Sequence, residues 1–89
     1  MRIFAVFAGD NEISVHNNFW NGVETVRYNG EEVSSKFSWF GATHRFSVEE
    51  DGQIVDYDVE VGFTLNGVSA NVWRNDRPIM IGLRRGSTC

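Results

Sequence analysis

Apolar and polar residues alternate along most of the chain, a pattern typical of strands with one buried and one solvated face. No stretch keeps the 3.6-residue apolar period of an amphipathic helix. The alternation therefore predicts short strands near residues 3–7, 12–17, 23–28, 32–38, 43–49, 53–61, 63–65, 68–74 and 78–81.

Three Asx-Gly pairs mark tight turns between these strands: Asn29-Gly30, Asp51-Gly52 and Asn66-Gly67. Such pairs tolerate the positive φ angles that a type I′ hairpin turn requires. β-Branched or aromatic residues flank each pair. We therefore expect three hairpins, which leave little room for helices in 89 residues.

The Asp51-Gly52 turn predicts a hairpin with a well-defined register. A two-residue loop places the apolar residues on one face and the carboxylates Asp56, Asp58 and Glu60 on the other, and a slip by one residue would bury these carboxylates. The expected partners are Val48 with Val55, Phe46 with Tyr57, His44 with Val59, Ser47 with Asp56, Arg45 with Asp58, and Thr43 with Glu60.

The other two turns predict further pairings by the same reasoning. The Asn29-Gly30 turn places Val26 opposite Val33, Thr25 opposite Ser34, and Arg27 opposite Glu32; the Asn66-Gly67 turn places Leu65 opposite Val68 and Phe63 opposite Ala70. Gly62 interrupts the alternation between two apolar residues, which favours a bulge or bend at this position.

Seven or eight short, turn-rich strands predict an all-β, single-domain antiparallel β-sandwich, with a small barrel as the alternative. We expect residues 1–82 to form this domain. Residues 83–89 show no apolar pattern, and we expect a flexible C-terminal tail there. Twelve aromatic residues supply the large side chains that a core of this size needs.

Composition excludes several classes of function. A net charge of −4 and a pI of about 5.0 argue against nucleic acid as the main partner. One cysteine, Cys89, cannot form an internal disulfide or a cysteine-rich zinc site. No apolar run is long enough to span a bilayer, so we expect a cytoplasmic protein without membrane association.

Candidate catalytic residues are few. His44 shares the apolar face with Phe46, whereas His16 is expected to point outward. No nucleophile elbow, phosphate-binding glycine loop or calcium loop occurs. We therefore predict no catalytic residue, metal or cofactor, and a protein that is not an enzyme. A hydrolase using His16 or His44 with a nearby carboxylate remains a third hypothesis.

The aromatic residues of two predicted loops are the candidate contact surface. Exposed tryptophans flanked by asparagines are typical of sugar stacking or of peptide anchoring. The alternative is that such rings close an open end of the sandwich. The expected binding residues are Phe19, Trp20, Trp39, Phe40, Asn18 and Asn21.

Between residues 22 and 61 the order of features resembles the β-sandwich repeat of the Fas apoptotic inhibitory molecule (FAIM) family and small uncharacterised bacterial β-proteins. The shared features are the strand before Asn29-Gly30, a second strand leading to Trp39-Phe40, the segment 43–48, and the segment 53–61. The resemblance implies a compact all-β fold and an interaction role without a catalytic centre. It transfers no functional residue.

These observations lead to a non-enzymatic interaction module as the main functional hypothesis. Its partner is another protein or a second copy of the chain, held by the aromatic residues or by an exposed strand edge. The alternative is a small-ligand or carbohydrate-binding domain that uses the same aromatic residues together with Asn17, Asn18 and Asn21.

Overall fold

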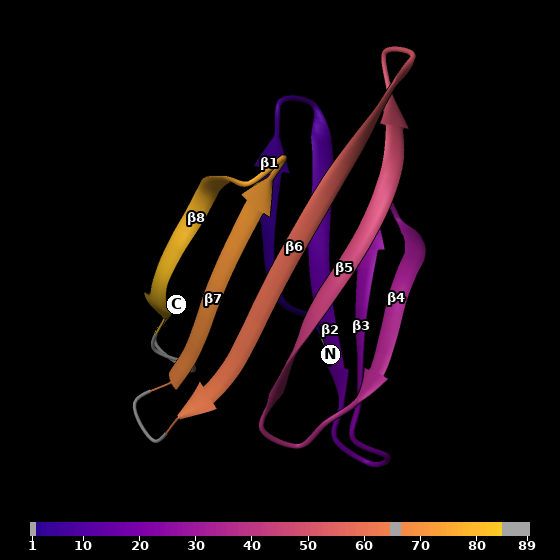
Figure 1. The fold of residues 1–89 in the computed structure, drawn as a ribbon. Coiled ribbons are helices and arrows are strands. Elements are labelled where there is room, and N and C mark those ends of the chain that lie inside the picture. The colour runs from indigo at the N-terminus through magenta and orange to yellow at the C-terminus, as the bar shows by residue number, and fades with distance from the viewer. Residues whose placement is uncertain (1, 65–66, 85–89) are drawn as a thin grey trace. The chain divides into compact units, whose positions relative to one another are not determined.

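The computed structural model describes residues 2–64 and 67–84 and shows an all-β chain (Figure 1). Its strands are β1 (Arg2–Ala8), β2 (Asn11–Asn18), β3 (Val23–Tyr28), β4 (Glu31–Phe37), β5 (Gly41–Glu50), β6 (Gln53–Thr64), β7 (Gly67–Arg74) and β8 (Arg77–Arg84). None of the described residues is helical, so none belongs to a helix that could cross a membrane.

The strands form two antiparallel sheets of four, with the orders β1-β2-β3-β4 and β5-β6-β7-β8. Neither is a closed barrel, so the barrel alternative is wrong, and the two open sheets are compatible with the predicted small β-sandwich. The chain divides into two compact units, one ending at Trp39 and the other beginning at Phe40. Of the expected tail, residues 83–84 belong to β8, and residues 85–89 lie outside the described residues.

One face of each sheet is buried, as the alternation predicts. In the first unit Phe4, Ile13, Val15 and Val26 are at most 2% exposed. Among the second-unit residues whose burial the structure describes, the buried apolar ones are Val55, Tyr57, Val59, Val61, Ala70 and Val72.

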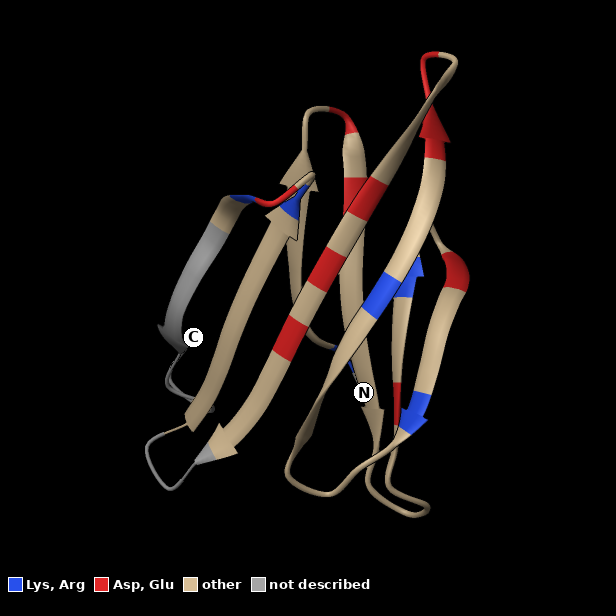
Figure 2. Cartoon of the chain, in the orientation of Figure 1, with Lys and Arg blue, Asp and Glu red and all other residues tan. Residues whose placement is uncertain are grey.

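The hairpin of β5 and β6 has the predicted register along its whole length. Asp51 and Gly52 adopt the positive φ angles of 52° and 79° that the turn requires. Arg45 lies opposite Asp58 and forms an ion pair with it at 3.0 Å. Acidic segments recur at intervals along β6 in Figure 2, in agreement with the predicted polar face.

The predicted register of β3 and β4 is correct only near the turn. Arg27 lies opposite Glu32, but beyond a bulge Val26 pairs with Ser34 instead of Val33, and Thr25 pairs with Ser35 instead of Ser34. The extra residue on β4 shifts the register of every pair beyond the bulge by one residue. As a result Lys36, a cation, lies opposite the fully buried Glu24.

The predicted register of β6 and β7 was wrong. Phe63 pairs with Val68 rather than Ala70, because the ladder closes at Thr64 and Gly67. The predicted partner Leu65 lies outside the described residues. The observed partner of Phe63 differs from the predicted one by two residues, so each side chain stays on the predicted face of the sheet.

Gly62 is not a bulge, because it pairs with Ser69 on one side and with Gly41 on the other in continuous ladders. The backbone conformation that requires a glycine occurs at Gly41 instead. Its φ is 115°, and a Cβ there would lie 2.0 Å from the carbonyl oxygen of Val61. The close approach of these two strands therefore requires a glycine at position 41.

In both units the same pair of hydrogen bonds joins a turn asparagine to a neighbouring strand. In the first unit, the Asn29 N–H donates to the Glu12 carbonyl and the Glu12 N–H donates to Asn29 Oδ1, both at 2.8 Å. In the second unit, Asn75 makes the same pair of bonds with Asp56, at 2.8 and 3.0 Å. Each turn asparagine thereby satisfies backbone groups of the strand that precedes its hairpin, which is β2 for Asn29 and β6 for Asn75.

The Asn75-Asp76 turn between β7 and β8 was not predicted, because it contains no glycine. Both residues have positive φ, 49° and 65°. Asn and Asp reach this region more readily than other non-glycine residues, so the Asx-Asx pair was the available signal.

Candidate functional site

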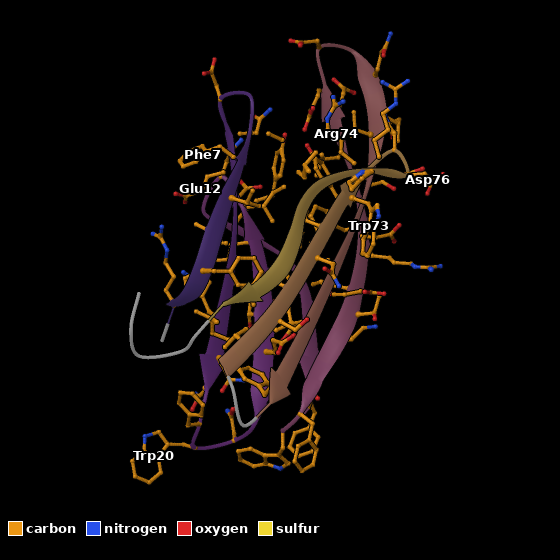
Figure 3. All side chains as sticks on the ribbon, turned by 90° about the vertical axis from the view of Figure 1, so that its left-hand side faces the viewer. Phe7, Glu12, Trp20, Trp73, Arg74 and Asp76 are labelled. Atoms are coloured by element: carbon orange, nitrogen blue, oxygen red, sulfur yellow. The ribbon has the colours of Figure 1, made fainter. Side chains whose placement is uncertain are left out.

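Four large aromatic side chains are exposed at one end of the first unit, which we call the aromatic end. Two belong to the β2–β3 loop, and two belong to the end of β4 and the segment that follows it. Figure 3 shows Trp20 projecting away from the strands. The exposed fractions are 56% for Phe19, 97% for Trp20, 68% for Phe37 and 50% for Trp39.

Asparagine side chains order the loop that presents Phe19 and Trp20. The Trp20 N–H donates to Asn18 Oδ1 at 2.9 Å, and the Val23 N–H donates to Asn21 Oδ1 at 3.0 Å. The Gly22 N–H closes the loop by donating to the Asn18 carbonyl at 2.8 Å. The predicted binding residues Asn18 and Asn21 therefore also hold the loop in shape.

The other half of the aromatic end is packed against the same loop. The Ser38 N–H donates to the Gly22 carbonyl at 2.8 Å. The rings of Phe37 and Trp39 meet edge to face, with centroids 5.8 Å apart. Both rings lie so close to Gly22 that a Cβ there would come within 2.9 Å of the Trp39 indole and 3.0 Å of the Phe37 ring.

Phe40, the fourth predicted aromatic residue, begins the second unit. Its side chain is 82% exposed, and its carbonyl accepts a hydrogen bond from the Phe63 N–H at 3.0 Å. Phe37 was missing from the predicted set. The crowding of aromatic residues between positions 36 and 41 was the signal that could have identified it.

A polar depression of about 270 Å³ lies on the first sheet beside the loop. Asn17, which the carbohydrate hypothesis includes, lines it but is only 4% exposed. It cannot serve as an open surface contact, because its position in β2 faces the buried side. The residues that line the depression are His16, Asn17, Asn18, Asn21, Val23, Thr25 and Arg27.

His16 lies within hydrogen-bond distance of Ser14, with Nε2 and Oγ 3.0 Å apart. Burial lowers the pKa of His16 below its usual 6.5, and the nearby charges of Arg27 and Arg2 lower it further, while Glu12 opposes them. The hydrolase hypothesis pairs His16 or His44 with a nearby carboxylate, whereas the group within hydrogen-bond distance of His16 is the Ser14 hydroxyl. In addition, Ser14 is only 4% exposed and His44 is fully buried, which keeps a substrate from both.

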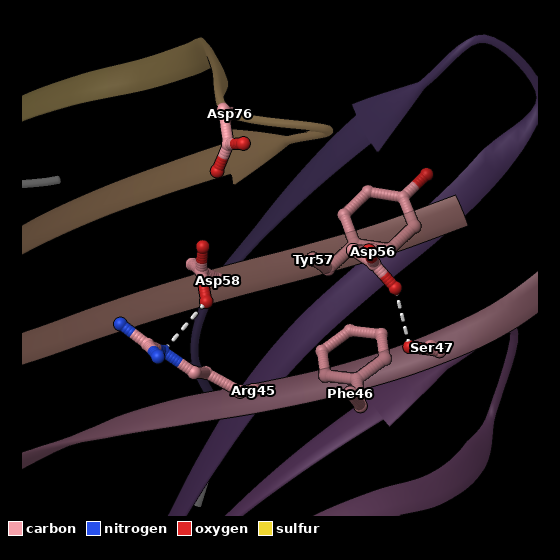
Figure 4. A pocket seen from close by; sticks show the side chains of 7 residues that line it. All are labelled: Arg45, Phe46, Ser47, Asp56, Tyr57, Asp58 and Asp76. Carbon is pink, nitrogen blue, oxygen red and sulfur yellow. Dashed lines mark hydrogen bonds and ion pairs between the residues drawn. The ribbon is translucent and has the colours of Figure 1, made fainter.

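The exposed face of the second unit is acidic and holds a depression of about 350 Å³ (Figure 4). Its side chains are largely engaged with one another: Ser47 donates to Asp56 at 2.5 Å, and Arg45 pairs with Asp58. Trp73 lies opposite Asp58 and therefore belongs to the same face. No group of three or more metal-ligating side chains occurs among the described residues.

No family model matches the chain, and neither a curated protein nor a solved structure matches it. The aromatic end and the polar depression are the two candidate sites of the first unit. They share the loop residues Asn18 and Asn21.

Proposed function

We propose that this chain is a non-enzymatic protein-interaction module whose contact surface is the aromatic end. The observation that carries the proposal is Trp20, which is 97% exposed on a loop that three hydrogen bonds hold in shape. Tryptophan is the residue type most enriched at the energetic centres of protein interfaces. An ordered loop loses little conformational entropy when a partner binds, so more of the contact energy appears as affinity.

The neighbouring rings extend this surface. Phe19, Phe37 and Trp39 are each at least half exposed, and exposed aromatic side chains grouped in this way are characteristic of interaction sites. The resemblance to the FAIM family, which implies an interaction role, supports the same conclusion. The proposal includes a cytoplasmic location and either another protein or a second copy of the chain as the partner.

Photo-crosslinking tests this proposal. A photoreactive amino acid at position 19, next to Trp20 on the same exposed loop, should capture a discrete set of proteins, or a second copy, in cells. The same group at position 54 is the matched control, since Ile54 is 68% exposed on a strand of the second unit. Equal capture from both positions would contradict the proposal. Light scattering of the purified chain at high concentration separates self-association from a different partner.

The Trp20 loop also favours a second candidate, a carbohydrate-binding domain. The indole is open for stacking on a sugar ring, and the amino groups of Asn18 and Asn21 lie on either side of it in the sequence. A glycan panel monitored by tryptophan fluorescence tests this candidate. Spectra that stay unchanged across the panel would remove its support.

A further inference from the structure

The polar depression beside the aromatic end brings together side chains from one face of two paired strands. His16 lies opposite Thr25, and Ser14 lies opposite Arg27. Asn18 and Asn21 close the depression at the loop. Cross-strand partners point to the same face of a sheet, so the ring of His16, the hydroxyl of Thr25 and the guanidinium of Arg27 share one surface.

Hydrogen-bond donors dominate this surface. The oxygens of Asn18 and Asn21 already accept backbone N–H groups at 2.9 and 3.0 Å. Each of these amides therefore has its amino group left to offer a ligand. Arg27 adds a guanidinium that only donates.

The charge of the depression opposes that of the whole chain, which carries −4. Among the described residues that line it, Arg27 is the one with a full charge, and none is a carboxylate. Arg2 lies opposite His16 in the β1–β2 ladder, and its positive charge helps to lower the pKa of His16. Two carboxylates offset part of this charge: Glu12 lies 3.8 Å from the Arg2 guanidinium, and Glu32 lies opposite Arg27 in the β3–β4 ladder.

We propose that this depression binds a small oxyanion, either a carboxylate or a phosphate group, with Arg27 as its main ligand. Guanidinium groups hold two oxygens of such anions through parallel charge-assisted hydrogen bonds. The amino groups of Asn18 and Asn21 supply further donors for the remaining oxygens. The Thr25 hydroxyl, which lies 3.5 Å from Ser35 Oγ, also lines the depression. This site shares Asn18 and Asn21 with the loop of the aromatic end but does not use the aromatic rings.

Nuclear magnetic resonance of the isotope-labelled chain tests the site. Sodium phosphate and sodium acetate are titrated separately at constant ionic strength, with sodium chloride as the balance. We expect saturable shifts of the Arg27 guanidinium and of the Asn18 and Asn21 amino signals with at least one of the two oxyanions. Shifts that rise linearly with both anions and match those of chloride would overturn the proposal.

Two variants assign the effect to Arg27. Arg27→Gln should weaken binding by at least about tenfold, since a charge-assisted hydrogen-bond pair is lost. Arg27→Lys, which keeps the charge but not the fork, should bind more weakly than the natural chain and provides a second test if Arg27→Gln is poorly folded. The charge-matched control is Arg45→Gln in the second unit.

Unchanged affinity in a folded Arg27→Gln chain would overturn the assignment. Trp20→Ser separates the two proposals, because it should abolish protein capture while leaving oxyanion binding intact. Loss of both functions in this variant would contradict an independent site.

Discussion

The rings of Phe37 and Trp39 meet edge to face at a centroid distance of 5.8 Å, with both lying against the α-carbon of Gly22. This arrangement ties the end of β4 to the β2–β3 loop. The contact between Phe37 and Trp39 thereby forms a packed base for the aromatic end, from which Trp20 projects into solvent.

Gly22→Ala should disturb this base. The substitution places a Cβ about 3 Å from two rings at a φ of +72°, so it combines a clash with backbone strain. We expect the free energy of unfolding to fall by about 1–3 kcal/mol, with a changed near-ultraviolet spectrum of the tryptophans. Gly30→Ala is the control, because its φ is +86° with nothing within 4 Å. Equal losses in the two variants would show that the ring contact has no energetic role.

Trp20→Ser should leave stability nearly unchanged, within about 0.5 kcal/mol, because the side chain is almost wholly solvated. Phe4→Ala, which removes a buried ring from the same unit, should cost about 3–5 kcal/mol. Urea denaturation of both variants measures the difference. A large loss for Trp20→Ser would mean that the indole is packed against the protein in solution.

The turn asparagines Asn29 and Asn75 should contribute similar amounts of stability in their separate units. Each adopts positive φ and bonds to the backbone of a strand through both its N–H and its Oδ1. Replacement by alanine should cost about 1–2 kcal/mol at each site. Replacement by glycine keeps the φ and should restore part of the loss. If alanine and glycine behave alike, the φ requirement is not the cause.

Tyr57 should titrate at unusually high pH. Burial and its 2.5 Å hydrogen bond to Glu50 raise the pKa of Tyr57 to about 12, while Arg74 pairs with the same carboxylate at 2.7 Å. The neutral phenol is favoured in the folded state. Its contribution to stability is therefore present below pH 10 and is lost as the pH rises from 10 towards 12.

Absorbance titration of the tyrosinate band should show this late step in the natural chain. The step should disappear in Tyr57→Phe, which leaves Tyr28 as the remaining tyrosine. A natural chain in which both tyrosines ionise near pH 10 would contradict the buried hydrogen bond.

His16 should make the chain less stable in mild acid. Burial, together with Arg27 and Arg2, lowers the pKa of His16, so the folded state favours the neutral ring. This contribution is complete above pH 6.5 and is lost as the pH falls below the usual value towards the lowered one. Between pH 7.5 and pH 5, the urea concentration at the unfolding midpoint should therefore fall more for the natural chain than for His16→Gln. Parallel slopes would count against the effect.

The sequence alone determined the register of the β5–β6 hairpin, and the physical reason lies in its side chains. The Asp51-Gly52 turn allows a two-residue loop, and any slip by one residue buries Asp56, Asp58 and Glu60. Turn chemistry and face pattern therefore admit one register, and the structure has it. The exposure of Trp20 and Phe19 could not be determined in this way, because a loop residue has no partner strand that assigns its face.

The tertiary structure decided what alternation leaves open. In β4 an extra residue at the bulge shifted every later pair and brought Lys36 opposite the buried Glu24, an outcome that depends on neighbours on another strand. The polar depression likewise exists only because pairing of β2 with β3 brings His16 beside Thr25 and Arg27 close to both. A period of two assigns faces within one strand, but only the packed ladder decides which side chains from different strands become neighbours.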